Sequence, residues 1–261
     1  MRWTTSRGGT RTGSARWTTS RGRDTTVNLW RAGLDAVPPG VWERTGLRVL
    51  ILADNRLTAL PEAIGRLRRL HTLDLGHNRL TALPAALGDL TGLTRYLYLH
   101  DNRLTDLPGT LGRLTGLAYL NVGENRLERL PDELGAMAGL VELRAQHNAL
   151  TTLPEGLGRL ASLRELWLRG NRLTGLPGSV DRLRELRELE LRDNALDAVP
   201  EALRGLPLLR RVDLRSNRLR ELPHWLGEMP SLEKLDLRWM DFDLDDERLR
   251  GLRERGCVVL T

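Results

Sequence analysis

One leucine pattern recurs at a nearly constant interval, and this repetition constrains the fold more than any other feature. A single unit places leucine at Leu47, Leu50 and Leu52, followed by Asn55. The asparagine then recurs along the chain, at Asn55, Asn78, Asn102, Asn125, Asn148, Asn171, Asn194 and Asn217. Successive asparagines are 23 residues apart, except for 24 between the second and the third. A period of this length indicates a solenoid, in which each unit contacts only its neighbours.

The spacing inside a unit predicts a short strand. In the segment Leu166-Trp167-Leu168 the two leucines point to one side of a strand and Trp167 points to the other. Strands of successive units must pair in parallel, because each reaches its neighbour only after a full turn of chain. Parallel sheets are normally covered on both faces, but only one face is apolar here. We therefore expect the other face to remain open to solvent as a concave surface.

The rest of each unit predicts how the chain returns to the next strand. The asparagine follows the strand, where its amide can satisfy backbone groups that lack a sheet partner. We therefore expect a structural ladder of asparagines, and leaving its buried partners unpaired would cost about 1–3 kcal/mol at each position. Leu60-Pro61 then stiffens the far side of the turn, because proline fixes φ. The segment that leads to Leu67 predicts one helical or 3-10 turn on the convex side.

These residues together follow the pattern LPxxLGxLxxLxxLxLxxNxL. The chain resembles the leucine-rich repeat proteins of the 23-residue class, which includes Ras-pathway scaffolds, related plant intracellular proteins and many bacterial proteins. The resemblance implies an α/β solenoid: a curved horseshoe with a parallel sheet on the concave face and short helical or 3-10 turns on the convex face. It also implies non-catalytic recognition of a protein on the concave face, without a cofactor, although partners vary widely on one fold.

The first 23 residues differ from the repeats. They contain six arginines and no acidic residue, and the heptamer RWTTSRG occurs twice in them. A polar, glycine-rich segment buries too little surface to offset its ordering entropy, so we expect residues 1–23 to form a disordered basic arm. The net charge of +6 resides in this arm, because the other basic and acidic residues balance. A leader segment, or an arm that binds nucleic acid or an anionic membrane surface, is the alternative.

Residues 24–261 are expected to form the repeat domain, with about ten units. The asparagine is replaced by Ala32 in the first unit and by Met240 in the last. Degenerate ends are expected, because a solenoid must close its core against water at both caps. Residues 245–260 predict a capping helix and a final strand. The single 24-residue unit predicts a bulge or a local change of curvature at Leu93–Tyr98.

The predicted open face carries all three tyrosines of the chain, Tyr96, Tyr98 and Tyr119, with Trp167 two strands beyond. Tyrosine and tryptophan are typical anchors of protein interfaces. The alternative is that aromatic residues simply favour exposed strand positions. The predicted partner-binding surface comprises Tyr96, Tyr98, His100, Tyr119, Asn121, Arg144, Trp167, Arg169, Arg192 and Arg215.

Towards the C-terminus the same face carries a column of arginines beside a mostly acidic column, from Glu165 to Arg238. Cross-strand ion pairs that keep an open sheet soluble explain this pattern, with each exposed pair worth about 0–1 kcal/mol. A polar docking rim is the alternative, and the two interpretations are compatible.

A further column stands immediately before the asparagines and offers oxygen and nitrogen atoms. It consists of Asp54, His77, Asp101, Glu124 and His147. Such groups could hold a divalent metal, but metal ligands converge on one point, whereas a column keeps its members parallel at strand spacing. We therefore predict no metal site.

Motifs of common enzymes are missing from the sequence: it has no phosphate-binding loop with lysine, no G-x-S-x-G and no H-E-x-x-H. The single cysteine, Cys257, lies in an apolar segment where a buried thiol is expected. With no apolar run of about 18 residues and no signal segment, we expect a monomeric cytoplasmic protein. A bacterial effector or signalling component with an unrecognised activity remains the alternative function.

Overall fold

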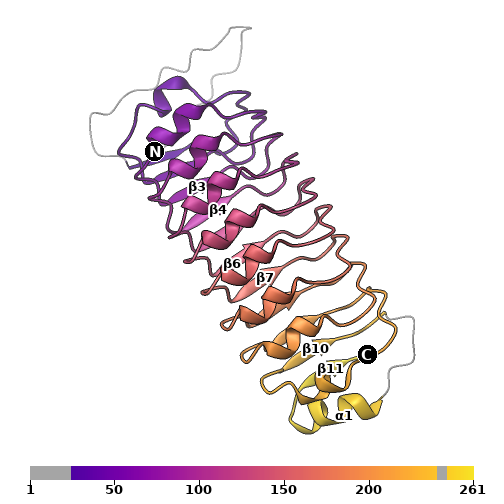
Figure 1. The fold of residues 1–261 in the computed structure, drawn as a ribbon. Helices are drawn as coiled ribbons and strands as arrows, with labels where there is room; N and C mark the ends of the chain where they lie inside the picture. Colours follow the sequence, from indigo (N-terminus) through magenta and orange to yellow (C-terminus); the bar gives the residue numbers. More distant parts are fainter. Residues whose placement is uncertain (1–24, 240–245) are drawn as a thin grey trace.

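The computed structural model describes residues 25–239 and 246–261. In these residues, eleven strands form one parallel sheet whose spatial order is the order of the chain. Figure 1 shows the coils stacked along a gentle arc, with the strands on one side and the short helices on the other. The predicted horseshoe, with its sheet on the concave face and 3-10 turns on the convex face, is confirmed.

Each strand is three residues long. In chain order the strands are β1 (Thr26–Asn28), β2 (Val49–Ile51), β3 (Thr72–Asp74), β4 (Tyr96–Tyr98), β5 (Tyr119–Asn121), β6 (Glu142–Arg144), β7 (Glu165–Trp167), β8 (Glu188–Glu190), β9 (Arg211–Asp213), β10 (Lys234–Asp236) and β11 (Val258–Leu260). The central residue of each strand from β2 to β10 is a leucine or valine that is at most 3% exposed, whereas its two neighbours face the open side. The leucines of successive coils therefore form one continuous core.

Nine 3-10 helices form the convex side of the described residues. They are η1 (Pro39–Val41), η2 (Glu62–Arg66), η3 (Ala85–Asp89), η4 (Gly109–Arg113), η5 (Asp132–Ala136), η6 (Glu155–Arg159), η7 (Gly178–Arg182), η8 (Glu201–Gly205) and η9 (His224–Glu228). A proline precedes each of them and holds an extended conformation, as at Pro61 with φ −76° and ψ 154°. Proline thus sets the point at which each helix begins.

The asparagines connect neighbouring coils through backbone groups. Asn78 is typical: its Oδ1 accepts a hydrogen bond from the Leu57 N–H at 3.0 Å. Its Nδ2 donates to the carbonyl oxygens of Leu52 and Leu75, at 3.0 and 3.1 Å. The same contacts recur at all eight asparagines. Each amide therefore joins its own coil to the one before it.

The extra residue of the long unit lies outside the sheet. Strand β4 pairs residue for residue with β3 and β5, so it contains no bulge. In this unit Thr94 separates Leu93 from Arg95, and the Arg95 N–H donates to the His71 carbonyl at 3.0 Å, as the corresponding residue of a shorter unit does. The turn before the strand absorbs the insertion, so the bulge expected at Leu93–Tyr98 does not occur in β4, and the alternative, a local change of curvature there, stays a prediction.

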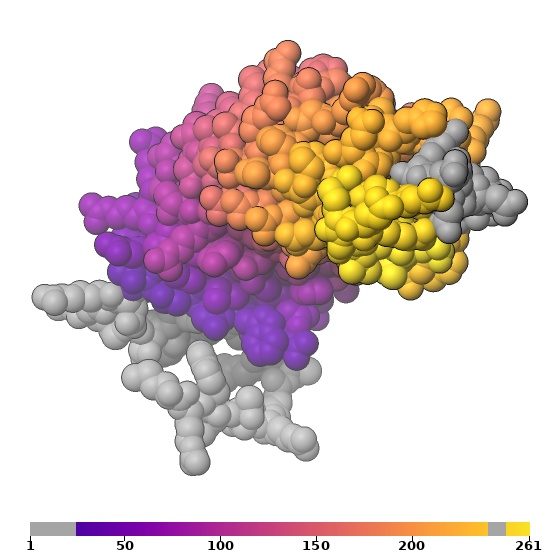
Figure 2. All heavy atoms as spheres, turned by 90° about the horizontal axis from the view of Figure 1, so that it is seen from below, coloured from indigo at the N-terminus to yellow at the C-terminus, as the bar shows by residue number. Residues whose placement is uncertain are grey.

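A helix and a strand cover the C-terminal end of the solenoid. Helix α1 (Asp246–Glu254) packs against η9 and buries Leu249 and Leu252. Strand β11 then pairs with β10. In Figure 2, which views the molecule from below, the yellow C-terminal residues lie over the orange last repeats. The segment predicted to be a basic arm, residues 1–23, lies outside the described residues.

Candidate functional site

The three tyrosines meet on the open face of the sheet. Tyr96 and Tyr98 flank the buried Leu97 on β4, and their rings stack with centroids 5.8 Å apart. Tyr119 on β5 lies 5.7 Å from the Tyr96 ring and 5.1 Å from the Tyr98 ring. These spacings are those of interacting aromatic pairs. Tyr96, Tyr98 and Tyr119 are called the tyrosine cluster below.

The tyrosine cluster is accessible, although its members differ in exposure. Tyr96 is 43% exposed, whereas Tyr98 and Tyr119 are half-buried. Burial raises the pKa of Tyr98 and of Tyr119 above the ordinary value for a phenol. The hydroxyl groups therefore stay protonated near neutral pH and can donate hydrogen bonds to a bound partner.

Arg144 connects the tyrosine cluster to Trp167. Its guanidinium carbon lies 5.9 Å from the Tyr119 ring centroid and 4.9 Å from the Trp167 ring centroid, both within cation–π range. The Arg144 Nε donates to Glu142 at 2.5 Å, and the Trp167 Nε1 donates to Glu165 at 3.2 Å. The aromatic surface therefore continues from β4 to β7.

The structure brings His100 onto the face but leaves it half-buried. Its ring lies over Gly76, where a Cβ atom would come within 2.4 Å of the imidazole. Only glycine leaves room for a ring in this position. Burial, and then the nearby His77, lower the pKa of His100, so the imidazole is neutral near pH 7. Its Nδ1 is buried and has no hydrogen-bond partner in the described residues.

Asn121 does not have the exposure that a contact residue needs. It is 7% exposed, and its Oδ1 accepts a hydrogen bond from the Gly123 N–H at 3.0 Å. Its Nδ2 lies 3.4 Å from the Tyr119 hydroxyl oxygen. Sequence alternation places Asn121 correctly on the open face, but the surrounding side chains cover it. Asn121 therefore supports the tyrosine cluster from below.

The predicted arginines lie in a separate area of the same face, on β7–β10. We call this area the charged zone; it comprises Arg169, Glu188, Glu190, Arg192, Asp193, Arg211, Asp213, Arg215, Asp236 and Arg238. Its arginines are paired with acids of the same or an adjacent coil. Arg215 contacts both Asp213 and Asp236, and its side chain is only 18% exposed. The charged zone therefore neutralises much of its own charge.

Glu190 is an unusual carboxyl group in the charged zone. It faces Asp213 on the next strand, and its Oε1 is buried with no hydrogen-bond partner in the described residues. Burial, and then the charge of Asp213, raise the pKa of Glu190 to about 7. A hollow of about 190 Å³ opens beside these residues and is bounded by Trp167. No sequence pattern singled out Glu190, because its pKa depends on groups from other strands.

The column of acids and histidines before the asparagines has a backbone explanation. Every member has a positive φ: 60° at Asp54, 52° at His77, 49° at Asp101, 56° at Glu124 and 52° at His147. Among residues other than glycine, aspartate and histidine tolerate this left-handed region comparatively well. Within the described residues, no group of three or more His, Cys, Asp and Glu side chains could hold a metal.

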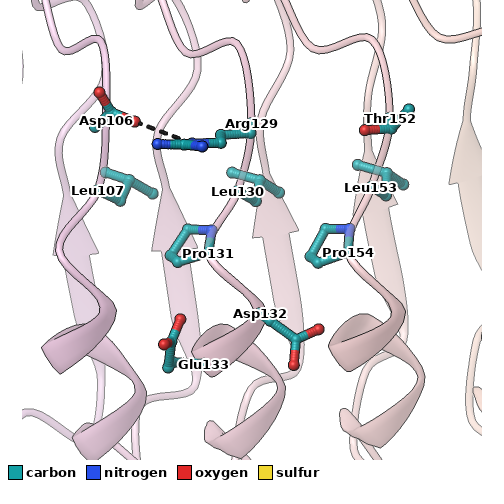
Figure 3. A pocket seen from close by; sticks show the side chains of 10 residues that line it. All are labelled: Asp106, Leu107, Arg129, Leu130, Pro131, Asp132, Glu133, Thr152, Leu153 and Pro154. Atoms are coloured by element: carbon teal, nitrogen blue, oxygen red, sulfur yellow. Dashed lines mark hydrogen bonds and ion pairs between the residues drawn. The ribbon is translucent and has the colours of Figure 1, made fainter.

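A second hollow, of about 450 Å³, lies on the flank between the strands and the 3-10 helices. Figure 3 shows that Leu107, Leu130 and Leu153 of three successive coils form its row of apolar side chains. Asp106 and Arg129 stand at one edge, 3.4 Å apart and mostly exposed. A Leu-Pro or Val-Pro segment precedes each 3-10 helix of the described residues, so this hollow follows from the repeat and brings no distinct set of polar groups together.

Two further observations concern chemistry and membranes. Burial raises the pKa of the Cys257 thiol, which keeps it protonated and therefore weakly nucleophilic. Among the described residues, no helix combines the length and the apolar character that crossing a bilayer would require.

Comparison with protein families identifies the chain's family. The model described as "Leucine rich repeat" matches residues 25–80, 45–103 and 185–242, and that described as "Leucine-rich repeat region" matches residues 94–174. The first model alone spans more than half of the chain. The chain therefore belongs to the leucine-rich repeat family, as its sequence pattern predicts. A comparison with curated proteins found no match.

Several solved structures share this fold. A leucine-rich repeat protein of Leptospira interrogans is 25% identical, covers 90% of this chain and 77% of its own, and has a TM-score of 0.62. The Arabidopsis receptor kinase HAESA, solved with the peptide hormone IDA and the co-receptor SERK1, is 29% identical and has a TM-score of 0.72. The match covers 84% of this chain and 38% of the HAESA chain. The plant peptide hormone receptor RGFR1, in complex with RGF2, is 26% identical and has a TM-score of 0.65. The match covers 86% of this chain and 41% of the RGFR1 chain. This chain thus spans about two-fifths of those two receptor chains.

Proposed function

We propose that the protein is a non-catalytic binding module that recognises another protein through the tyrosine cluster and Trp167. The observation that carries this proposal is the position of the cluster. Three tyrosines contact one another on the water-facing side of the sheet, and Tyr96 is 43% exposed. Tyrosine offers a large, rigid contact area with a polar tip, and tyrosine and tryptophan are enriched among residues that dominate binding energy.

The similar receptor structures support the same mode of action. HAESA was solved with a peptide hormone and RGFR1 with RGF2, so related solenoids bind polypeptide ligands. We further propose that this chain acts as a monomeric scaffold in the cytoplasm. The single cysteine, which is buried, supports a reducing compartment.

The test compares what the protein captures with and without the tyrosine cluster. The full chain and a Tyr96→Ala/Tyr98→Ala variant are immobilised and exposed to extract from the source cells, and captured proteins are quantified by mass spectrometry. Arg68→Ala/Arg69→Ala is the matched control, because these two exposed side chains lie in the turn after η2, away from the sheet face. The partner is then purified, and its Kd is measured for all three proteins.

We expect the double tyrosine variant to bind the purified partner at least about thirtyfold more weakly, because interface anchors commonly contribute about 2 kcal/mol or more. The control should remain within about twofold of wild type. Equal affinity for wild type and the tyrosine variant would move the binding site elsewhere on the molecule.

A further inference from the structure

Two carboxylates that form no salt bridge in the described residues lie on the same face as the tyrosine cluster, one on each side of it. Asp74 lies beside Tyr98 on the adjacent strand, and Glu165 lies beyond Glu142 on β7. Within residues 25–239 and 246–261, neither Asp74 nor Glu165 forms a salt bridge. Their short contacts are hydrogen bonds accepted from the Gly76 N–H, at 3.0 Å, and from the Trp167 Nε1. Both carboxylates therefore retain the capacity to accept hydrogen bonds from a bound cation.

The negative charges of Asp74 and Glu142 affect Tyr98. After burial and the neighbouring Tyr96, the charges of Asp74 and Glu142 raise the pKa of Tyr98 further, against a smaller opposing effect of Arg144. Negative charge therefore prevails at Tyr98, whereas at Tyr119 the lowering effect of Arg144 on the pKa exceeds the raising effect of Glu142. Arg144 is the cation here, and Glu142 already holds it.

The cluster also offers aromatic rings to a cation. Arg144 shows this chemistry inside the molecule, since its guanidinium lies over both Tyr119 and Trp167. The faces of tyrosine and tryptophan attract arginine and lysine, and a nearby carboxylate adds a charge-assisted hydrogen bond. The surface combines both elements at Tyr96 and Tyr98, beside Asp74, where no arginine or lysine of the described residues fills the position.

The acids lie at the two ends of the aromatic surface. Asp74 is on β3 and Glu165 is on β7, so four strand spacings separate them. At about 4.8 Å per spacing, this distance is about 19 Å. An extended peptide that crosses the strands advances about 3.3 Å per residue, so about six residues span the interval.

Building on the proposed function, we propose that the partner presents an extended basic segment to this face. The segment carries two arginine or lysine side chains about six residues apart, one at Asp74 and one at Glu165, and its intervening residues cover the tyrosine cluster. The occupant is thus a cationic stretch of a partner protein, recognised by charge complementarity and by the aromatic rings.

The experiment selects peptides directly on the protein and does not require the partner to be identified first. A displayed library of random peptides about twelve residues long, enough to span about 40 Å, is selected on the full chain. Binders retained by the Tyr96→Ala/Tyr98→Ala variant are removed by subtraction. Selected sequences are synthesised, and their Kd values are measured against wild type, Asp74→Asn, Glu165→Gln and the control Glu128→Gln. Glu128 is an exposed acid outside the strands, and both amide substitutions retain an oxygen acceptor.

We expect the selected peptides to share two basic residues spaced about five to seven positions apart. Asp74→Asn and Glu165→Gln should each weaken their binding about fivefold, while Glu128→Gln changes it less than about twofold. Peptides that require the tyrosines but are neutral or acidic would overturn the basic segment and leave the proposed function intact. If no peptide depends on the tyrosines, both ideas fail.

The chain's own residues 1–23 are the other cationic segment that must be tested. A full-length variant with its six arginines replaced by glutamine serves this purpose. Peptide affinity within about twofold of wild type supports a partner segment as the occupant. A rise of about tenfold or more would show that the arm competes for the face, and would overturn the assignment to a partner.

Discussion

The tyrosine cluster and the charged zone share one backbone and one core but have opposite surface properties. Strands β4 and β9 are each three residues long and pair in register with their neighbours, and their central residues are at most 3% exposed. On the open face, the charged zone pairs its arginines with its own acids, whereas Asp74 and Glu165, at the ends of the aromatic surface, form no salt bridge in the part of the chain that the structure describes. A partner at the charged zone must break existing ion pairs, but a partner at the tyrosine cluster need not. The framework is therefore constant, and recognition depends on the residues between the leucines.

The largest expected effect concerns the core. It tests whether buried leucines contribute equally to stability beneath the tyrosine cluster and beneath the charged zone. Leu97→Ala under the tyrosine cluster and Leu189→Ala under the charged zone should each lower the free energy of unfolding by about 2–5 kcal/mol, because each leaves a cavity among fully packed leucines. Chemical denaturation followed by circular dichroism measures both. A difference greater than about 3 kcal/mol between the two variants would contradict a uniform core.

The asparagine ladder should show the same equivalence at a smaller scale. Asn102→Ala and Asn194→Ala each remove one acceptor and one donor that join neighbouring coils. We expect a loss of about 1–3 kcal/mol for each, because backbone groups of Leu80 or Leu173 are left unpaired. Asn→Asp variants are a useful comparison, since they keep the acceptor and lose the donor. If the two alanine variants unfold at the same denaturant concentration as wild type, these asparagines do not have a structural role.

The fold could be predicted from the sequence because its determinants are local and periodic. Leucine alternation specifies which side of a strand is buried, and proline specifies where each turn begins. Thr94 shows the limit of this reasoning. The long unit is easy to count, but its extra residue could lie in the strand or in the turn, and only the hydrogen bonds of Arg95 place it.

The candidate site was harder to predict. The alternation of residues along a strand shows on which face of the sheet a side chain lies, but not how exposed that side chain is. It places Tyr96 and Asn121 on the same surface, yet Tyr96 is 43% exposed and Asn121 is 7% exposed. Neighbouring side chains from other coils decide this difference. The column containing His77 resembles a set of metal ligands in the sequence because a sequence does not display φ, and the left-handed backbone supplies a simpler explanation.

A property specific to the charged zone is its dependence on pH. The pKa of Glu190 is raised to about 7 in the folded protein, above its value in an unfolded chain. Between these two values the folded state binds more protons, so the contribution of Glu190 is favourable at low pH and is lost as pH rises through about 7. Glu190→Gln should therefore stabilise the protein at about pH 8, by about 1 kcal/mol once solvent screening of the partly exposed group is allowed for.

Thermal unfolding of wild type and Glu190→Gln at about pH 6 and about pH 8 measures this effect. The matched control is Glu188→Gln, which removes the carboxylate that pairs with Arg211. The control should not gain stability at the higher pH. If Glu190→Gln stabilises the protein equally at both pH values, the Glu190 carboxyl group does not titrate between them.

The smallest expected effect compares one ion pair from each area. Arg144–Glu142 lies beside the tyrosine cluster, with side-chain exposures of 37% and 19%, and Arg211–Glu188 lies in the charged zone, with 58% and 32%. Double-mutant cycles to glutamine should give a coupling energy of about 1 kcal/mol for the first pair and less than about 0.5 kcal/mol for the second, because water screens the more exposed pair. Raising the salt concentration to about 1 M should abolish the second coupling and only reduce the first. Equal couplings with equal salt dependence would show that the aromatic rings do not shield Arg144, and that the two areas differ in composition alone.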